Sequence, residues 1–388
     1  MDVLDGVFAN ALRCGLKRSA LDLAYLYVPQ ATGSAGVFTQ HSFAASSVVE
    51  TRQKVANLKA VLINSGNANA CTGSEGAEHT RELIAAAAEH LGISVDQVGM
   101  ASTGVIGKPL DLACIKSGME RLFEDPFVQN YDLAAEAILT TDSCSKTAYR
   151  DVLYQKQSLR AFGMTKGSGM IAPNMATTLT FVVLSVDLPS DMLQEMLAIA
   201  VDRSFNRISV DSDTSTNDMV LCFASGQHSL DWKDLKTQIF VQDLLDDLCL
   251  DLAKQVVLDG EGATKLIEVC VEGAKDEAFA VALAKQVVDS PLVKTAIHGQ
   301  DANWGRLLMA IGKSADLPVD PQSLTLFLGK HKLFLNGEQR VYNKEEMINY
   351  LCEDHIVIRY CLGQGSARAS VFGCDLSAAY VSINTAYN

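Results

Sequence analysis

The chain has 388 residues, of which 48% are hydrophobic and 20% charged, and its formal net charge is −14 at pH 7. This composition is typical of a globular protein that buries its own core, and the length favours roughly two or three domains. The acidic excess argues against nucleic acid and against an anionic membrane surface as partners, because both bind clustered Lys and Arg.

The ten cysteines are scattered, and none forms a Cys-x-x-Cys pair. They are typical of reduced core residues in a cytoplasmic protein. The opening residues MDVLDGVF lack a signal-peptide pattern, and no apolar run reaches the ~18 residues of a membrane span. We therefore expect a cytoplasmic protein without a membrane partner. The histidines show no zinc spacing, so no metal is expected. Among them, His298 alone is expected in a loop rich in Gly and Asn.

The predicted elements alternate between strands and helices. Strands are expected at 55–64, 98–107 (with a turn), 178–187 and 266–273, and helices at 81–91, about 190–202, 240–257 and 275–289. A loop rich in Gly, Asn and Ser is expected at 65–76, and Gly92 is expected to cap the first helix. From residue 324 the alternation continues as two strands, a helix and two strands. The pattern indicates a layered α/β or α+β protein, with a domain boundary between 270 and 295.

The segment KGSGMIAPNMATT, at 166–178, stands directly before a predicted strand. The small Ala176 precedes Thr177, as a self-cleaving nucleophile requires, because the Thr hydroxyl must reach its own preceding carbonyl. The freed α-amino group, with a pKa of ~7.7–8.0, would then accept the hydroxyl proton. The alternative is a tight or phosphate-binding turn at 166–169, although Lys166 precedes the glycines, unlike in a Walker motif. Spacing leaves both open.

Three further segments have two interpretations each. Thr103 and Gly104 suit an oxyanion hole, because glycine lets a backbone N–H approach an oxygen closely, but a strand-ending turn fits as well. The Asn-rich run at 64–69 could orient a polar substrate or adopt left-handed turn geometry. Glu261 lies between two glycines, where it could pair with a substrate ammonium or form part of a helix-terminating turn.

Taken together, these motifs resemble the ornithine acetyltransferase family of arginine biosynthesis, also called glutamate N-acetyltransferase or ArgJ. The resemblance runs almost end to end. In chain order it is carried by GVFANALRCGLK, DLAYLYVPQATGSAGVFT, VLINSGNANACTG, ASTGVIGKPL, ILTTDS, KGSGMIAPNMAT, SVDSDTSTND, DGEGATK, KTAIHGQDANWGR and YVSINTAY.

The resemblance implies a layered αββα fold that processes itself as N-terminal-nucleophile enzymes do. It implies a catalytic domain at 1–275 and a smaller C-terminal α/β domain at 276–388. Cleavage between Ala176 and Thr177 would give chains 1–176 and 177–388, which stay together as an α2β2 heterotetramer. The implied reaction transfers acetyl from N2-acetyl-L-ornithine to L-glutamate through an ester on Thr177. It needs no metal and no cofactor, and some family members also use acetyl-CoA as a co-substrate.

The resemblance also implies roles for individual residues. Thr177 is the nucleophile, Thr103 and Gly104 form the oxyanion hole, and the substrate contacts are Thr140, Lys166, Thr177, Glu261 and Asn384. Two positions depart from the family pattern. The family usually has a last contact, Ser or Thr, five residues after Asn384, whereas this sequence is given to Asn388. Thr178 stands where Met is common.

Two other functions fit the same residues. An N-terminal-nucleophile amidohydrolase or aminopeptidase would use Thr177 but pass the acyl group to water. An unprocessed, non-catalytic relative would keep the fold without the reaction. The density of motifs for binding amino acids favours transfer over hydrolysis, and the intact Ala176-Thr177 pair favours an enzyme.

Overall fold

The computed structural model describes residues 4–172 and 178–386. These residues form two compact units: unit 1 holds 4–167, 178–206 and 214–256, and unit 2 holds 168–172, 207–213 and 257–386. The last change of unit therefore falls after Val256 and not at the expected 275/276 boundary. The reason is strand β11 (Leu266–Ala274), which pairs with two later strands and so belongs with the C-terminal part.

Unit 1 is built on two sheets. The first has the order β1 (Phe8–Leu12), β2 (Leu23–Tyr27), β4 (Ala60–Asn67), β5 (Val98–Val105). The second has the order β3 (Gly33–Phe38), β10 (Met219–Ser229), β8 (Leu179–Asp187), β7 (Gln157–Lys166), β6 (Lys146–Tyr154). Its helices are α1 (Ser46–Gln53), α2 (Gly73–Leu91), α3 (Leu112–Leu122), α4 (Tyr131–Ala137), α5 (Ser190–Arg203) and α6 (Leu235–Leu258), with single 3-10 turns at Val55–Asn57, Val95–Gln97 and Phe205–Arg207.

The first sheet is buried on both faces, which explains why β4 reads as a continuous apolar run. Successive side chains of a strand point to opposite faces. Val61 accordingly shares a core with Phe181 of the second sheet, whereas its neighbour Leu62 packs with Ile84 of α2. Residues of the two sheets thus form one common core, and α2 and α3 cover the outer face of the first sheet.

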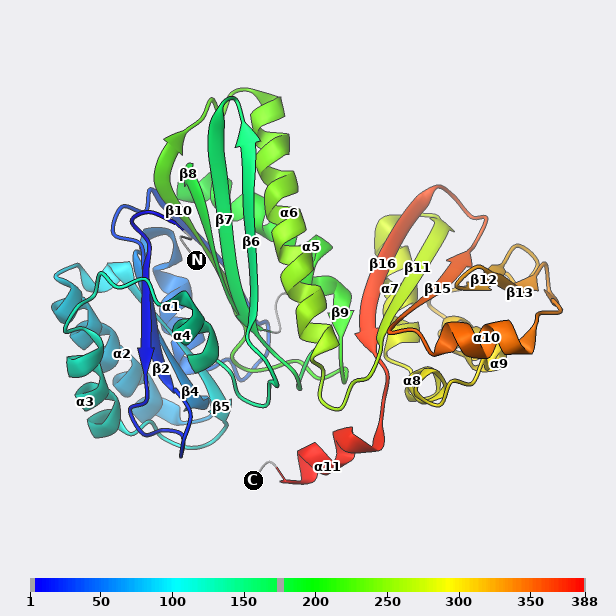
Figure 1. Cartoon of the computed structure of the whole chain (residues 1–388), viewed down its shortest axis with the longest axis horizontal. Helices are drawn as coiled ribbons and strands as arrows, with labels where there is room; N and C mark the ends of the chain where they lie inside the picture. Colours follow the sequence, from blue (N-terminus) through cyan, green and yellow to red (C-terminus); the bar gives the residue numbers. More distant parts are fainter. Residues whose placement is uncertain (1–3, 173–177, 387–388) are drawn as a thin grey trace. The chain divides into compact units, whose positions relative to one another are not determined.

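The outer face of the second sheet is covered by α5 and α6 (Figure 1). Gly163 in β7 lets α6 approach, because a Cβ there would lie 2.5 Å from Leu252 Cδ1. Gln255 of α6 also donates to the carbonyl of Thr147 in β6, at 3.1 Å. The order helix–sheet–sheet–helix confirms the expected layered αββα fold.

Unit 2 contains one sheet of order β14 (Glu338–Gln339), β13 (His331–Leu335), β12 (Thr325–Leu328), β15 (His355–Cys361), β11, β16 (Ala367–Cys374), β9 (Ile208–Ser209). Its helices are α7 (Glu277–Val288), α8 (Pro291–His298), α9 (Trp304–Gly312), α10 (Lys344–Leu351) and α11 (Ala378–Ala386). Val269 in β11 packs with Leu283 of α7 and Ile358 of β15, so the sheet and its helices share a single core.

Most predicted elements are confirmed, and Gly92 ends α2 with a φ of +64° as expected. The loop predicted at 65–76 is wrong at both ends, because β4 continues to Asn67 and α2 already begins at Gly73. Gly76 allows this early start: a Cβ there would lie 1.9 Å from Thr72 Oγ1. The β6–β7 hairpin and helix α11 had no counterpart among the predicted elements.

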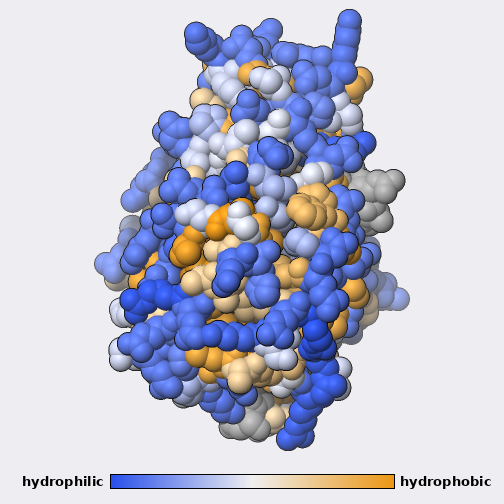
Figure 2. All heavy atoms as spheres, turned by 90° about the vertical axis from the view of Figure 1, so that its left-hand side faces the viewer, coloured by the Kyte–Doolittle hydropathy of each residue, from blue (hydrophilic) through white to orange (hydrophobic). Residues whose placement is uncertain are grey.

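Hydrophilic side chains cover much of the face drawn in Figure 2, where apolar side chains gather in smaller patches. Within residues 4–172 and 178–386, no helix is long and apolar enough to cross a membrane.

The shared core of the two sheets predicts a large cost for truncating Phe181, which is fully buried in β8. We expect Phe181→Ala to lower the free energy of unfolding by about 3–5 kcal/mol. In urea titrations the midpoint should fall while the slope stays unchanged. Leu153→Ala is the control, since Leu153 is 76% exposed and should change stability by less than about 0.5 kcal/mol. Equal effects of the two substitutions would contradict this packing.

Candidate active site

Thr103 and Gly104 lie near the end of β5, which pairs in parallel with β4. The register is irregular here, because Asn67 faces both Thr103 and Val105. Gly104 has a φ of +130°, and a Cβ there would lie 2.3 Å from the carbonyl carbon of Gly66. No other residue fits this backbone without a shift of β4. The strand end is therefore fixed in a shape that only glycine adopts easily.

The Asn-rich run after β4 supports the backbone. Asn64 Nδ2 donates to the carbonyl of Asn67 at 2.9 Å, and Asn67 Nδ2 donates to that of Pro109 at 2.9 Å. Asn69 has a φ of +47°, the left-handed geometry considered as the alternative for this run. These amides are used to shape the loop, so their described contacts favour the turn over a direct substrate role.

Asn217 holds the ends of β4 and β5 together, a role that the sequence reasoning missed. Its Nδ2 donates to the carbonyls of Ala68, at 2.6 Å, and Ser102, at 2.8 Å. Asn217 is buried and comes just before β10. The signal was its place in the motif SVDSDTSTND, whose small polar residues had been assigned no individual role.

Asp218, the next residue, is a fully buried carboxyl whose Oδ2 has no hydrogen-bond partner among the described residues. Burial raises its pKa well above the ordinary value, while the positive charge of Lys166 opposes that rise. Burial therefore disfavours the ionised form of this carboxyl.

Thr140 and Lys166, two of the predicted substrate contacts, are brought together by Asp142. Its carboxylate, 0% exposed, accepts hydrogen bonds from the backbone of Thr140 at 2.9 Å and of Gly167 at 2.7 Å, and from Lys146 Nζ at 2.6 Å. Burial raises the pKa of Asp142, but Lys146, Lys166 and these hydrogen bonds outweigh it and hold the pKa below its usual value. Asp142 therefore remains ionised at neutral pH.

Lys17 connects this region to the end of β4. Its Nζ donates to the carbonyls of Leu139, at 2.6 Å, and Leu21, at 3.0 Å. Its side chain also packs on Gly66, where a Cβ would lie 3.1 Å from Lys17 Cγ. Burial lowers the pKa of this ammonium. Contacts thus run from the oxyanion candidate Gly104 through Gly66 and Lys17 to the residue before Thr140.

Ala176 and Thr177 lie outside the described residues, so their predicted roles stay predictions. Thr178, the neighbour that departs from the family pattern, is buried, and its Oγ1 lies 2.6 Å from Thr180 Oγ1. Its carbonyl accepts from Met219 N at 2.9 Å. The second hydroxyl is therefore engaged within the sheet.

Glu261 and Asn384, in unit 2, are in direct contact although they lie 123 positions apart: Asn384 Nδ2 donates to Glu261 Oε2 at 2.6 Å. Glu261 is 8% exposed, and its backbone N–H donates to the carbonyl of Ser168 at 3.0 Å. Gly169 lets its carboxylate approach, because a Cβ there would lie 2.5 Å from Glu261 Cδ. The structure thus joins two residues that the resemblance assigned to one substrate site.

No arrangement of three or more His, Cys, Asp or Glu side chains suited to a metal ion is found within residues 4–172 and 178–386.

Comparison with known proteins identifies the family of this chain. The chain matches the ArgJ family over residues 8–388. It is 40% identical to the arginine biosynthesis bifunctional protein ArgJ of Bacillus thuringiensis, over 98% of this chain and 95% of that protein, and 42% identical to ArgJ of Bartonella quintana, over 99% and 95%. The crystal structure of ArgJ from Bacillus halodurans is 41% identical, with a TM-score of 0.51 over 53% of this chain and 97% of that chain.

A layered fold of two sheets, with an oxyanion candidate on one strand end, is a framework for acyl transfer. The chain belongs to the ArgJ family. It is an acyltransferase, as the family resemblance implied.

The lowered pKa of Asp142 predicts how stability depends on pH. An Asp whose folded pKa lies below its unfolded value of ~3.9 stabilises the fold above that value, and this contribution is lost as the pH falls through the folded pKa. Asp142→Asn leaves Lys146 buried without its carboxylate, so stability at pH 7 should fall by about 3–5 kcal/mol. The difference from wild type should narrow below pH ~4.

Urea unfolding at a series of pH values from neutral to acidic would measure this difference. Glu82→Gln is the control: Glu82 also has a lowered pKa, caused by its hydrogen bond with Lys116, but the pair is exposed and screened by water. A gap between Asp142→Asn and wild type that stays constant down to acidic pH would rule out the buried ion pair as its source.

Proposed function

We propose that this protein transfers an acetyl group from N2-acetyl-L-ornithine to L-glutamate through an ester on Thr177. One observation carries the proposal: the contact between Glu261 and Asn384, at 2.6 Å across 123 positions. Both positions match substrate contacts of the family, and the surrounding chain is 40% identical to ArgJ along nearly its whole length.

The chemistry balances as two equal halves. The Thr177 hydroxyl attacks the acetyl carbonyl, its proton passes through the α-amino group to the leaving nitrogen, and ornithine departs. The glutamate amine then attacks the ester, acetylglutamate forms, and the hydroxyl regains its proton. Because each half passes through a tetrahedral intermediate on the same carbonyl, one oxyanion hole serves both. Ping-pong kinetics follow from the covalent intermediate.

Each remaining residue has a role in this scheme. Thr103 and Gly104 would stabilise the oxyanion. Lys166, beside Thr140, would attract a substrate carboxylate or the developing negative charge. Glu261, oriented by Asn384, would meet the cationic amine of ornithine.

The proposal also covers maturation and assembly. Cleavage between Ala176 and Thr177 frees the α-amino group that serves as base, and the two products form an α2β2 heterotetramer in the cytoplasm. The reaction requires no metal or other cofactor. The similar bacterial proteins are named bifunctional, which supports acetyl-CoA as a second acetyl donor. Hydrolysis by an amidohydrolase of the same kind remains the competing reaction, distinguished by release of free acetate without need of glutamate.

Thr177→Ala should abolish both self-cleavage and acetyl transfer, because it removes the attacking hydroxyl. Intact-mass measurement should give two fragments in the wild type, whose masses sum to that of the chain plus one water, and a single chain in the variant. Thr178→Ala is the matched control, since its hydroxyl is bonded to Thr180 within the sheet. Cleavage should persist in this control. A wild-type protein that stays uncut would overturn the mechanism and favour the non-catalytic alternative.

Thr103→Val should lower kcat by about 10²–10³-fold, the usual effect of removing one oxyanion donor, while the K_M values change little. Ser102→Ala is the neighbouring control: the buried Ser102 Oγ has no hydrogen-bond partner among residues 4–172 and 178–386. Initial rates with N2-acetyl-L-ornithine and L-glutamate measure both variants. An equal loss of kcat in the two variants would show that the effect arises from the packing of β5 and not from lost stabilisation of the oxyanion.

A further inference from the structure

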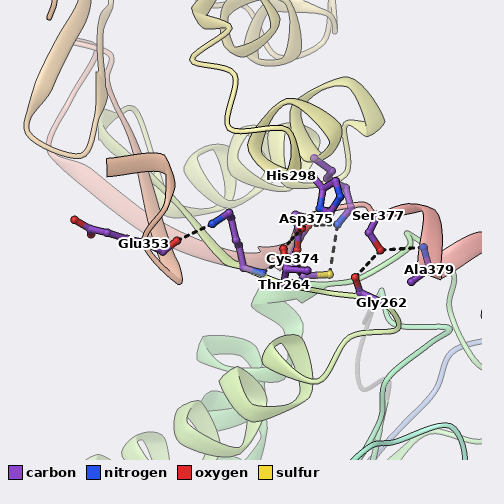
Figure 3. Close-up of polar contacts among 10 residues, drawn as sticks. Gly262, Thr264, His298, Glu353, Cys374, Asp375, Ser377 and Ala379 are labelled. Carbon is purple, nitrogen blue, oxygen red and sulfur yellow. Dashed lines mark hydrogen bonds and ion pairs between the residues drawn. The ribbon is translucent and has the colours of Figure 1, made fainter. Parts of the chain in front are cut away.

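The junction between β16 and α11 is anchored more heavily than a surface connection requires. Asp375, the first residue after β16, has a side chain that is 0% exposed. It accepts four hydrogen bonds: from Thr264 N at 2.7 Å, Thr264 Oγ1 at 2.6 Å, Lys265 N at 2.9 Å and His298 Nδ1 at 2.7 Å. Figure 3 shows Thr264, in the loop before β11, and His298, at the end of α8, converging on this carboxylate.

Helix α8 holds the same junction with two residues one turn apart. His298 contacts Asp375, and the buried Lys294 donates to the carbonyl of Cys374 and lies 3.7 Å from its Sγ. Such i, i+4 side chains share one helix face. Burial raises the pKa of Asp375, but the hydrogen bonds from Thr264 and His298 outweigh it and keep the pKa below normal. The carboxylate is therefore ionised, and its hydrogen bonds are of the strong, charge-assisted kind.

The junction leads directly into helix α11, which contains Asn384. Ser377 Oγ donates to the carbonyl of Gly262 at 2.6 Å, and a Cβ on Gly262 would lie 2.7 Å from Tyr380 N. The loop that begins with Glu261 and the start of α11 are thus joined at both Asp375 and Ser377. Asn384 reaches Glu261 two turns further along the helix.

We infer that Asp375 is a positioning residue: by tying the β16–α11 junction to Thr264, Lys265 and His298, it sets the place of Asn384 against Glu261 and so controls substrate affinity. This inference rests on the proposed function of Glu261 and Asn384. Asp375 acts through these two residues and does not bind substrate directly, because its carboxylate already accepts four hydrogen bonds within the protein.

The test compares Asp375→Asn with Asp276→Ala. Asp276 lies in the same unit and caps α7 by accepting from Phe279 N at 2.7 Å, so its loss weakens the unit without touching the junction. We expect Asp375→Asn to raise K_M for N2-acetyl-L-ornithine roughly five- to tenfold with kcat within about twofold. Asp276→Ala should leave KM unchanged although it also lowers thermal stability. A K_M that rises equally in both variants would overturn the inference.

A second readout is independent of activity. Amide hydrogen exchange across 378–386 should become faster in Asp375→Asn and stay at the wild-type rate in Asp276→Ala. If the wild type shows no acetyl transfer, the proposed function fails. The anchoring role of Asp375 is overturned by a different result, namely an unchanged exchange rate in Asp375→Asn. His298→Ala removes one of the four donors and should give smaller effects in the same direction, which keeps the test open if Asp375→Asn does not fold.

Discussion

The candidate site depends on buried carboxylates that fasten loops of distant sequence to one another. In unit 1 Asp142 accepts from the backbone of Thr140 and Gly167 and from Lys146. A buried charge costs several kcal/mol unless hydrogen bonds satisfy it. If either segment moved away, the carboxylate would lose a hydrogen bond and the fold would lose stability. Asp375 plays the same part in unit 2, where it joins the end of β16 to Thr264. Backbone amides, and not side-chain packing alone, set the positions of these loops.

Close backbone approach adds a second constraint. Gly104 stands against Gly66 with no room for a Cβ, and Gly169 stands equally close to the Glu261 carboxylate. Asn217 then ties the loop after β4 to strand β5 through two carbonyls. An oxyanion hole works only if its donors are fixed before the charge develops. The glycines permit such geometry, and the amide of Asn217 holds it.

The layered fold could be predicted where burial governs the pattern. Strand β8 is apolar along most of its length, and both of its ends fall close to the expected residues; helix α6 has an apolar face and ends where expected, although it begins earlier, at Leu235. The start of α2 and the boundary between the units could not be predicted, because they depend on contacts with residues distant in sequence. The pairing of β11 with β15, for example, assigns β11 to unit 2. Glu261 and Asn384 were paired by family resemblance and not by periodicity. Asp142 escaped notice because an Asp that accepts backbone hydrogen bonds looks, in sequence, like any surface Asp.

The charges near Lys166 bear on how an acidic chain would admit the anionic substrate of the proposed reaction. A formal charge of −14 would repel a substrate carboxylate unless the site created its own field. Asp142 is matched by Lys146 at 2.6 Å, so much of its negative charge is already compensated. Burial raises the pKa of Asp218, which disfavours a second negative charge near Lys166. A carboxylate approaching Lys166 therefore meets less repulsion than the net charge suggests. The pairing of Asp142 with Lys146 thus weakens the negative field that a substrate carboxylate would meet at Lys166 in the proposed reaction.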